Sequence, residues 1–231
     1  MTDRVALVTG ASSDIGAAIS HRLAEAGAHV IASGRNLKKL VRIAANHGSK
    51  IDIVAADLTN PGDVEAVRES VSQRERLDVL VLGSGIYLRS NDPEAFTHQL
   101  AANVQGPYAL LEAVLPLLIA AKGLVIFINS TQGLAASPGV GQFAATQHAM
   151  RALANSVREE VHSRGVRVTS LFLGRTATAR QKAIFAMERR HYAPELLVQP
   201  ADVANVVAHL TMLSSASEVM EMTLRPAVKS Y

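Results

Sequence analysis

Short apolar runs alternate along the chain with longer tracts in which apolar residues recur every three or four positions. The apolar runs predict β-strands at residues 5–9, 29–33, 51–56, 77–82, 124–129, 167–173 and 219–224. The tracts between them predict helices ending near 26, at 37–47, 61–74, 94–121 and 140–164, and after 200. An interruption is expected near 106–107, because proline cannot continue the helical hydrogen bonds. This alternation predicts an α/β fold, a doubly wound parallel sheet with helices on both faces, in one domain spanning 1–231.

The first predicted strand ends in a turn of small residues that leads directly into a helix. Gly10, Ala11 and Ser12 would let the backbone approach a pyrophosphate, whose charge is stabilised by free N–H groups at the helix N-terminus. Gly16, one turn later, would let the helix pack closely on the sheet. Two glycines at this spacing also occur in ordinary loops. The strand, helix and strand around them complete a βαβ unit, which favours the phosphate interpretation.

The composition of the 231 residues narrows the classes of function. Hydrophobic residues make up 48%, enough for a substantial core, whereas aromatic residues make up only 4% and offer few rings to stack on bases. The net charge is only +3, so nucleic acid is not expected as a partner although the pI is near 9.4. The sequence has no cysteine, and its histidines show no metal-ligand spacing. No signal peptide or membrane-spanning run is apparent, so we expect a soluble, cytoplasmic protein without a membrane partner.

Several motifs, in the expected order, resemble those of the short-chain dehydrogenase/reductase family over nearly the whole chain. Residues 9–16, TGASSDIG, resemble its T-G-x-x-x-G-x-G turn, and residues 82–85, LGSG, resemble its N-N-A-G segment. Asp57 and Leu58 resemble its acidic pair on the adenine side, and residues 173–178, LGRTAT, resemble its P-G-x-x-x-T. The resemblance implies a Rossmann-type fold, a nicotinamide cofactor, and hydride exchange with a small carbonyl or alcohol substrate.

The resemblance also implies roles for individual residues. Those expected to bind the cofactor are Gly10, Ser12, Ser13, Ile15, Gly16, Arg35, Asp57, Leu58, Gly83, Ser84, Gly85, Gln147, Thr176 and Thr178. Those at the family's catalytic positions are Asn103, Ser130, Phe143 and Gln147. At the end of the second strand an NAD site usually has an acid, whereas this chain has Arg35, which can bind the 2′-phosphate. We therefore expect NADP(H) in preference to NAD(H).

The chain departs from the family where proton transfer takes place. In register with the family's Y-x-x-x-K are Phe143 and Gln147. Phe143 has no proton to exchange, and Gln147 can hydrogen-bond a ribose but brings no positive charge. We therefore expect an impaired or altered proton relay. Asp14 stands where the family usually has a glycine; either it caps the first helix, the favoured interpretation, or it faces the pyrophosphate.

Three candidate residues also have structural explanations. Ser130 could serve the turn after its strand, Asn103 could bridge backbone groups beside the helix interruption, and Asp57 could form a turn or cap the next helix. These alternatives remain open beside the functional roles.

Positive charge gathers between residues 151 and 190, with nine Arg or Lys against three Glu. A solvated helix face is the ordinary explanation. The alternative is that basic residues on a polar excursion at 174–200, which in the family covers the substrate, favour an acidic ligand: Arg175, Arg180, Lys182, Arg189 and Arg190. Of these, Arg175 is best placed in sequence to reach a cofactor phosphate or a substrate carboxylate.

The favoured hypothesis is an NADP(H)-linked oxidoreductase with an altered relay. The alternative is a family member that has lost its chemistry and acts as a cofactor-binding, sensing or subunit-partner protein; non-redox chemistry has no positive support. Members of the family commonly pair through the two helices that flank the fifth strand, here 104–121 and 140–164. The first is more apolar than one buried stripe requires. We therefore expect a homo-dimer or homo-tetramer.

Overall fold

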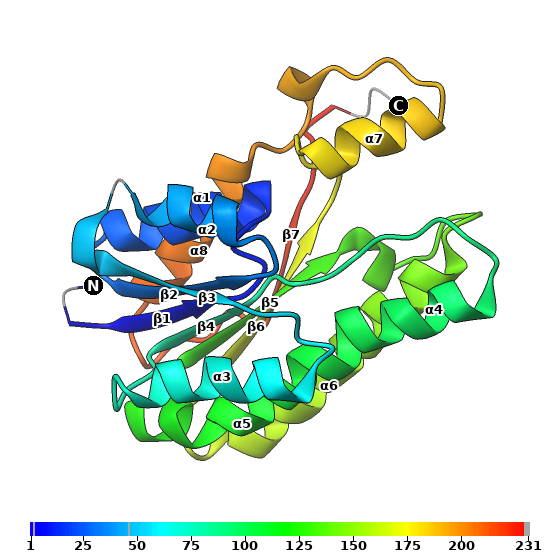
Figure 1. Ribbon diagram of the computed structural model, residues 1–231. Helices are drawn as coiled ribbons and strands as arrows, with labels where there is room; N and C mark the ends of the chain where they lie inside the picture. Colours follow the sequence, from blue (N-terminus) through cyan, green and yellow to red (C-terminus); the bar gives the residue numbers. More distant parts are fainter. Residues whose placement is uncertain (2, 46, 229–231) are drawn as a thin grey trace.

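The computed structural model describes residues 1, 3–45 and 47–228 and is built around one parallel β-sheet (Figure 1). The strands are β1 (Val5–Val8), β2 (His29–Gly34), β3 (Ile51–Ala55), β4 (Val79–Leu82), β5 (Leu124–Ser130), β6 (Arg167–Leu173) and β7 (Glu221–Leu224). Their order in the sheet is β3-β2-β1-β4-β5-β6-β7, and every neighbouring pair is parallel. The order reverses between β1 and β4, so the predicted doubly wound parallel sheet is confirmed.

Helices cover both faces of this sheet (Figure 1). One face carries α1 (Asp14–Glu25), α2 (Leu37–Ala44) and α8 (Pro200–Met212). The other carries α3 (Pro61–Ser72), α5 (Gly106–Ala121) and α6 (Gly141–His162). Two shorter helices, α4 (Pro93–Leu100) and α7 (Ala179–Met187), extend past the carboxyl ends of the central strands.

The central strands are continuous apolar runs because each lies between two layers of helices. All four residues of β1 are buried, and side chains that alternate along it point to opposite faces. Ala6 and Val8 pack in the core under α1, whereas Val5 and Leu7 pack in the core under α5. This arrangement leaves the carboxyl ends of β1, β4, β5 and β6 at one edge, where loops are free to form a ligand site.

The long tract before β5 differs from its prediction. A π-helical turn, Ala101–Gln105, joins α4 to α5, so the helix is bulged before residue 106 and is not broken at 106–107. Pro107 lies in the first turn of α5, where its missing N–H is not needed. The whole tract, Pro93–Ala121, is 29 residues long and is apolar enough to cross a membrane by length and composition, which the hydrophobic pattern did not suggest. Its α5 half packs on the sheet through Leu110, Leu111 and Val114, as a core helix does.

The predicted excursion at 174–200 is more ordered than its polar sequence indicates. It contains α7, which Thr178 caps by accepting a hydrogen bond from the Gln181 N–H at 3.1 Å, and a short 3₁₀ turn, Pro194–Leu196. Thr176 pairs with Val198 in an isolated bridge, which closes the base of the excursion. The excursion is therefore a structured wall beside the strand ends.

Candidate functional site

A cleft opens at the carboxyl edge of the sheet, beside the point where the strand order reverses. It consists of a cavity of about 440 Å³ and a smaller one of about 210 Å³, which share wall residues. The larger is lined by Ser13, Ile15, Gly16, Asn103, Ser130, Phe143, Gln147, Thr176 and Thr178, the smaller by Gly10, Ser12, Ser13, Arg35, Asp57 and Leu58, and both by Gly83, Ser84 and Gly85. The fold thus brings together every residue that the sequence assigned to a cofactor or to catalysis.

The turn after β1 is shaped by its backbone. Gly10 has a φ of +67°, and a Cβ added there would lie 2.5 Å from the carbonyl oxygen of Gly83. Ser13 caps α1, its Oγ accepting a hydrogen bond from the Gly16 N–H at 3.1 Å. The turn therefore holds the start of α1, with its favourable field for anions, directly at the cleft.

Asp14 does not cap the first helix, so that interpretation was wrong. Ser13 is the cap, and Asp14 is the first residue of α1. Its Oδ2 accepts a hydrogen bond of 2.7 Å from the backbone N–H of Ala179, the first residue of α7. The carboxylate therefore ties α7 to α1 across the mouth of the cleft.

The smaller cavity ends at Arg35, directly after β2. Its Nη1 lies 3.8 Å from Oδ2 of Asp57, and 57% of the Arg35 side chain is exposed. Oδ1 of Asp57 accepts hydrogen bonds from the N–H and hydroxyl of Thr59, so Asp57 is a turn residue, while Asn60 caps α3. Burial alone would raise the pKa of Asp57, but the bonds from Thr59 and the charge of Arg35 outweigh it and lower the pKa.

Asn103 fixes the loop that follows β4. Its Oδ1 accepts a hydrogen bond from the Ile86 N–H at 2.7 Å, and its Nδ2 donates to the Ile86 carbonyl at 3.0 Å and to Oγ1 of Thr146 at 3.1 Å. Asn103 is buried on the π-helical turn, a type of bulge frequent at functional sites. Asn103 therefore bridges backbone groups, as its structural explanation predicts. Those groups belong to Ile86 in the loop after β4, however, and not to the helix that carries Asn103.

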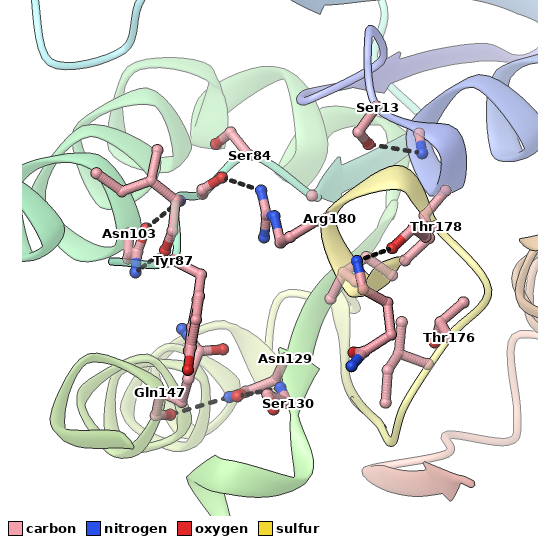
Figure 2. A pocket seen from close by; sticks show the side chains of 18 of the residues that line it. Ser13, Ser84, Tyr87, Asn103, Asn129, Ser130, Gln147, Thr176, Thr178 and Arg180 are labelled. Carbon is pink, nitrogen blue, oxygen red and sulfur yellow. Dashed lines mark hydrogen bonds between the residues drawn. The ribbon is translucent and has the colours of Figure 1, made fainter. Parts of the chain in front are cut away.

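Gln147 and Ser130 both take part in hydrogen bonds within the protein (Figure 2). Nε2 of Gln147 donates to Oγ1 of Thr146 at 3.2 Å, and its backbone carbonyl accepts from Nδ2 of Asn129 at 3.0 Å. Oγ of Ser130 accepts from the Gln132 N–H at 3.2 Å and caps the short helix Thr131–Gly133. Ser130 therefore serves the predicted turn and still faces the cleft.

Tyr87 is a cleft residue that no motif in the sequence predicts. Its ring packs edge-to-face on that of Phe143, with centroids 5.1 Å apart and an interplanar angle of 77°. Burial raises the pKa of the Tyr87 phenol, while the charge of Arg89 opposes this and that of Glu188 adds to it. A tyrosine two residues after Gly85 was the available signal, but no spacing rule connects it with Phe143, which lies on a helix far along the chain.

Arg180 divides the cleft between its two cavities. It extends from α7, and its Nη2 donates a hydrogen bond of 2.7 Å to the Gly85 carbonyl in the loop after β4 (Figure 2). Solvent reaches the side chain through the open cleft, yet protein surrounds its guanidinium on most sides. This burial, and next the charge of Arg35, lower the pKa of Arg180. The sequence placed Arg180 only within a basic cluster.

The remaining positive charge on the excursion is partly neutralised. Arg175 donates to both carboxylate oxygens of Glu188 at 2.8 and 3.0 Å, and its guanidinium lies 4.7 Å from the Phe185 ring centroid. Arg89 and Arg190 also lie within 4 Å of the same carboxylate. Arg175 is therefore engaged by Glu188 in this structure.

The cleft fits a dinucleotide in three ways. Its phosphate turn leaves no space for a side chain at Gly10, α1 begins beside it, and Oγ of Ser84 is buried with no hydrogen-bond partner among residues 1, 3–45 and 47–228. Ser84 lines both cavities, where a ligand can satisfy that hydroxyl. Within the same described residues, no group of three or more His, Cys, Asp or Glu could hold a metal ion.

A model of the family described as short chain dehydrogenase matches residues 4–189. The chain belongs to the short-chain dehydrogenase family. This family of oxidoreductases has the Rossmann-type fold observed here, so the predicted family and fold are confirmed.

Several related proteins match the chain nearly end to end. An uncharacterized oxidoreductase of Staphylococcus aureus is 30% identical over 234 residues, 98% of each chain, and one of Staphylococcus epidermidis is 29% identical over 230 residues, 97% of each. A metagenomic short-chain oxidoreductase solved in complex with NADP is 30% identical with a TM-score of 0.83 over 99% of each chain. A serine dehydrogenase complexed with NADP⁺ is 25% identical with a TM-score of 0.89, over 98% of this chain and 96% of that one.

Proposed function

We propose that this short-chain dehydrogenase is a cytoplasmic, NADP(H)-preferring oxidoreductase for small carbonyl or alcohol substrates, with a proton relay altered from the family pattern. The observation that carries the cofactor preference is the position of Arg35. It directly follows β2 and lines the smaller cavity together with Ser12, where it supplies a cation for a 2′-phosphate. Two related proteins, described above, have been solved with NADP or NADP⁺ bound.

In this proposal each part of the cleft has one task. The turn at Gly10 and the start of α1 hold the pyrophosphate, and the free hydroxyl of Ser84 adds a hydrogen bond. The amide of Gln147, beside Thr146, takes the nicotinamide ribose, and Ser130 orients the substrate oxygen. The bound cofactor gives or takes hydride at the substrate carbon.

The altered relay follows from taking Phe143 and Gln147 as the residues at the family's tyrosine and lysine positions. Neither side chain exchanges a proton. Losing a positioned general acid costs about 10²–10⁴ in rate, or roughly 3–5 kcal/mol of barrier. Turnover is therefore slow unless another group in the cleft supplies the proton.

Assembly is part of the same proposal. On α5 the side chains of Leu115, Leu117 and Ile119 are only half-buried, which leaves apolar surface beside α6. A second copy of the chain that covers α5 and α6 would bury it, giving a homo-dimer or, with a second interface, a homo-tetramer.

The test is a fluorescence titration with NADPH and NADH, followed by NADPH oxidation with a panel of small ketones, quinones and oxo-acids. We expect Arg35→Ala to weaken NADPH binding by about 10-fold to 10²-fold, the effect of one charge-assisted phosphate contact, and to leave NADH binding unchanged. Arg42→Ala, which removes an exposed cation from α2 outside the cleft, is the matched control. Equal affinity of the wild type for both cofactors contradicts the preference. NADPH binding without any turnover would favour a cofactor-binding, sensing or subunit-partner role.

A further inference from the structure

Two aromatic rings meet in the wall of the larger cavity. The Tyr87 ring lies edge-on against Phe143, with the centroids 5.1 Å apart, and the two side chains come from the loop after β4 and from α6. Both residues line the cavity that also contains Ser130 and Gln147. Figure 2 shows the Tyr87 side chain extending from its loop toward the helix that carries Gln147. A phenol therefore lies beside the ring that has none.

The backbone that carries this phenol is held firmly. Asn103, itself buried, binds both the N–H and the carbonyl of Ile86, the residue that precedes Tyr87. Edge-to-face packing on Phe143 then restricts the ring. A group whose backbone and ring are both fixed by the protein is preorganised, which is what proton transfer to a bound substrate requires.

The Tyr87 hydroxyl is also available. In the part of the chain that the structure describes, it has no hydrogen-bond partner, and the side chain is half-buried on the cavity wall. Two acidic groups in that wall are engaged: Asp14 binds the Ala179 N–H, and Glu188 is held by Arg175. Tyr87 thus supplies a proton donor with nothing else to bind.

We propose that Tyr87 is the catalytic proton donor of the reductive reaction. This inference rests on the proposed function, because it assigns one step of that reaction. When the carbonyl carbon accepts hydride from the nicotinamide cofactor, its oxygen gains the electron pair of the C=O π bond and takes the proton of the Tyr87 hydroxyl. The phenolate that remains regains a proton from water, and in the oxidative direction the same phenolate accepts the alcohol proton.

The charges around Tyr87 suit a group that must lose and regain a proton. Arg89 and Arg175 favour the phenolate, whereas burial and Glu188 favour the neutral phenol, and together they leave the pKa raised above its ordinary value of 10.0. The phenol is therefore protonated at neutral pH, ready to donate. We expect kcat for reduction to stay level through neutral and mildly alkaline pH and to fall only as pH rises through the raised pKa.

The first experiment compares carbonyl reduction by the wild type and Tyr87→Phe. We expect kcat to fall about 10²–10⁴-fold, with KM and NADPH affinity unchanged, because the variant keeps the ring and its packing. The double variant Tyr87→Phe/Phe143→Tyr moves the hydroxyl to the other ring of the pair and should regain part of the lost rate. Tyr108→Phe, on α5 outside the cleft, is the matched control and should retain full activity.

A second measurement needs no turnover. The ultraviolet absorbance of the wild type and of Tyr87→Phe is recorded against pH. The difference between the two curves gives the titration of the Tyr87 phenol. It is recorded with NADPH and with NADP⁺ bound. The oxidised nicotinamide ring carries a positive charge, so a neighbouring phenol should have a lower pKa in the NADP⁺ complex.

The outcomes separate the two proposals. If Tyr87→Phe reduces carbonyls as fast as the wild type, or if its titration is the same with both cofactors, the role of Tyr87 is overturned while the proposed function stands. If the wild type binds NADPH but reduces nothing, the proposed function is wrong, and so is the proton donation assigned to Tyr87.

Discussion

The end of the cleft at Gly10 and Arg35, where we propose that the phosphates bind, is formed mainly by backbone, whereas the end at Phe143 is formed by side chains. We call them the phosphate end and the Phe143 end. At the first end, Gly10 and α1 shape the site, and Arg35 supplies the cation on which the proposed cofactor preference depends. At the second, the geometry depends on the hydrogen bonds between Asn103 and Ile86 and on one pair of aromatic rings. A site formed by the backbone tolerates few substitutions, because an added side chain would fill space that must stay open, as at Gly10.

A reaction step that depends on one side chain can be supplied from another position in the sequence. A hydroxyl can come from either of two rings in contact, although Tyr87 and Phe143 lie 56 positions apart by their residue numbers. We therefore expect substitutions of the glycine turn at the phosphate end to damage folding and binding together. At the Phe143 end, substitutions that only remove or add a hydroxyl, such as Tyr87→Phe, should change the rate and leave folding and binding nearly intact.

After the loss expected for Tyr87→Phe, the largest expected effect is a gain in rate at the Phe143 end. In Phe143→Tyr the new phenol lacks the lysine that completes the family's pair, and in Gln147→Lys the new cation has no hydroxyl at position 143 to act on. Together they should raise kcat by about 10²-fold or more, beyond the product of the single effects, because neighbouring groups are coupled. NADPH oxidation by the wild type, both single variants and the double variant measures this coupling.

Two results would contradict this expectation. If the wild type already turns over at about 10 per second, an ordinary enzymatic rate, its relay is not impaired. If the double variant binds NADPH but stays inert on every carbonyl, the loss extends beyond these two positions. Unfolding curves of all four proteins provide the control, because the double variant places a charge where Gln147 is buried.

An effect of similar size, on stability and on binding together, is expected at Gly10. An alanine there must adopt a positive φ, and its Cβ would lie 2.5 Å from the Gly83 carbonyl, so either β4 or the turn has to shift. We expect Gly10→Ala to lower the free energy of unfolding by about 2–4 kcal/mol and to weaken NADPH binding in parallel. Denaturant unfolding and cofactor titration measure the two losses.

Gly48→Ala is the matched control for that prediction. Gly48 also has a positive φ, +56°, but nothing lies within 4 Å of an added Cβ. Gly48→Ala should lower the free energy of unfolding by only about 1 kcal/mol and leave the NADPH affinity unchanged. If the two variants lose equal stability, backbone conformation and not close approach explains the requirement for glycine at the turn.

The sequence was sufficient for most of the fold, because buried parallel strands and amphipathic helices follow directly from apolar periodicity. Each predicted strand is present, with ends displaced by no more than a few residues, as at β4, which begins at Val79 instead of 77. The pattern missed α7 because its exposed, polar face resembles a loop. The interruption near 106–107 was predicted from Pro107, whereas the π-helical turn just before it leaves no signature in hydrophobic spacing.

The candidate site was predictable to the extent that its residues follow strands. Parallel strands end at one edge, so the residues after β1, β2, β4, β5 and β6 meet there whatever their identity. Contacts between distant segments were not predictable: Asp14 with the start of α7, Arg180 with the Gly85 carbonyl, and the aromatic pair. Each depends on a side-chain direction that spacing along the chain does not encode.

The smallest expected effect concerns Asp57, at the phosphate end. Its pKa in the folded protein lies below the ordinary 3.8, so its carboxylate stabilises the fold above that pH, and the contribution disappears as pH falls through the lowered value. Since 41% of the side chain is exposed, solvent limits this contribution to less than about 1 kcal/mol. Asp57→Asn should therefore be slightly less stable than the wild type at neutral pH and equally stable in strong acid, as denaturant unfolding across that range would show. Glu69→Gln, an exposed carboxylate on α3, controls for net charge. A constant difference at every pH would mean that the carboxylate charge is not what stabilises this turn.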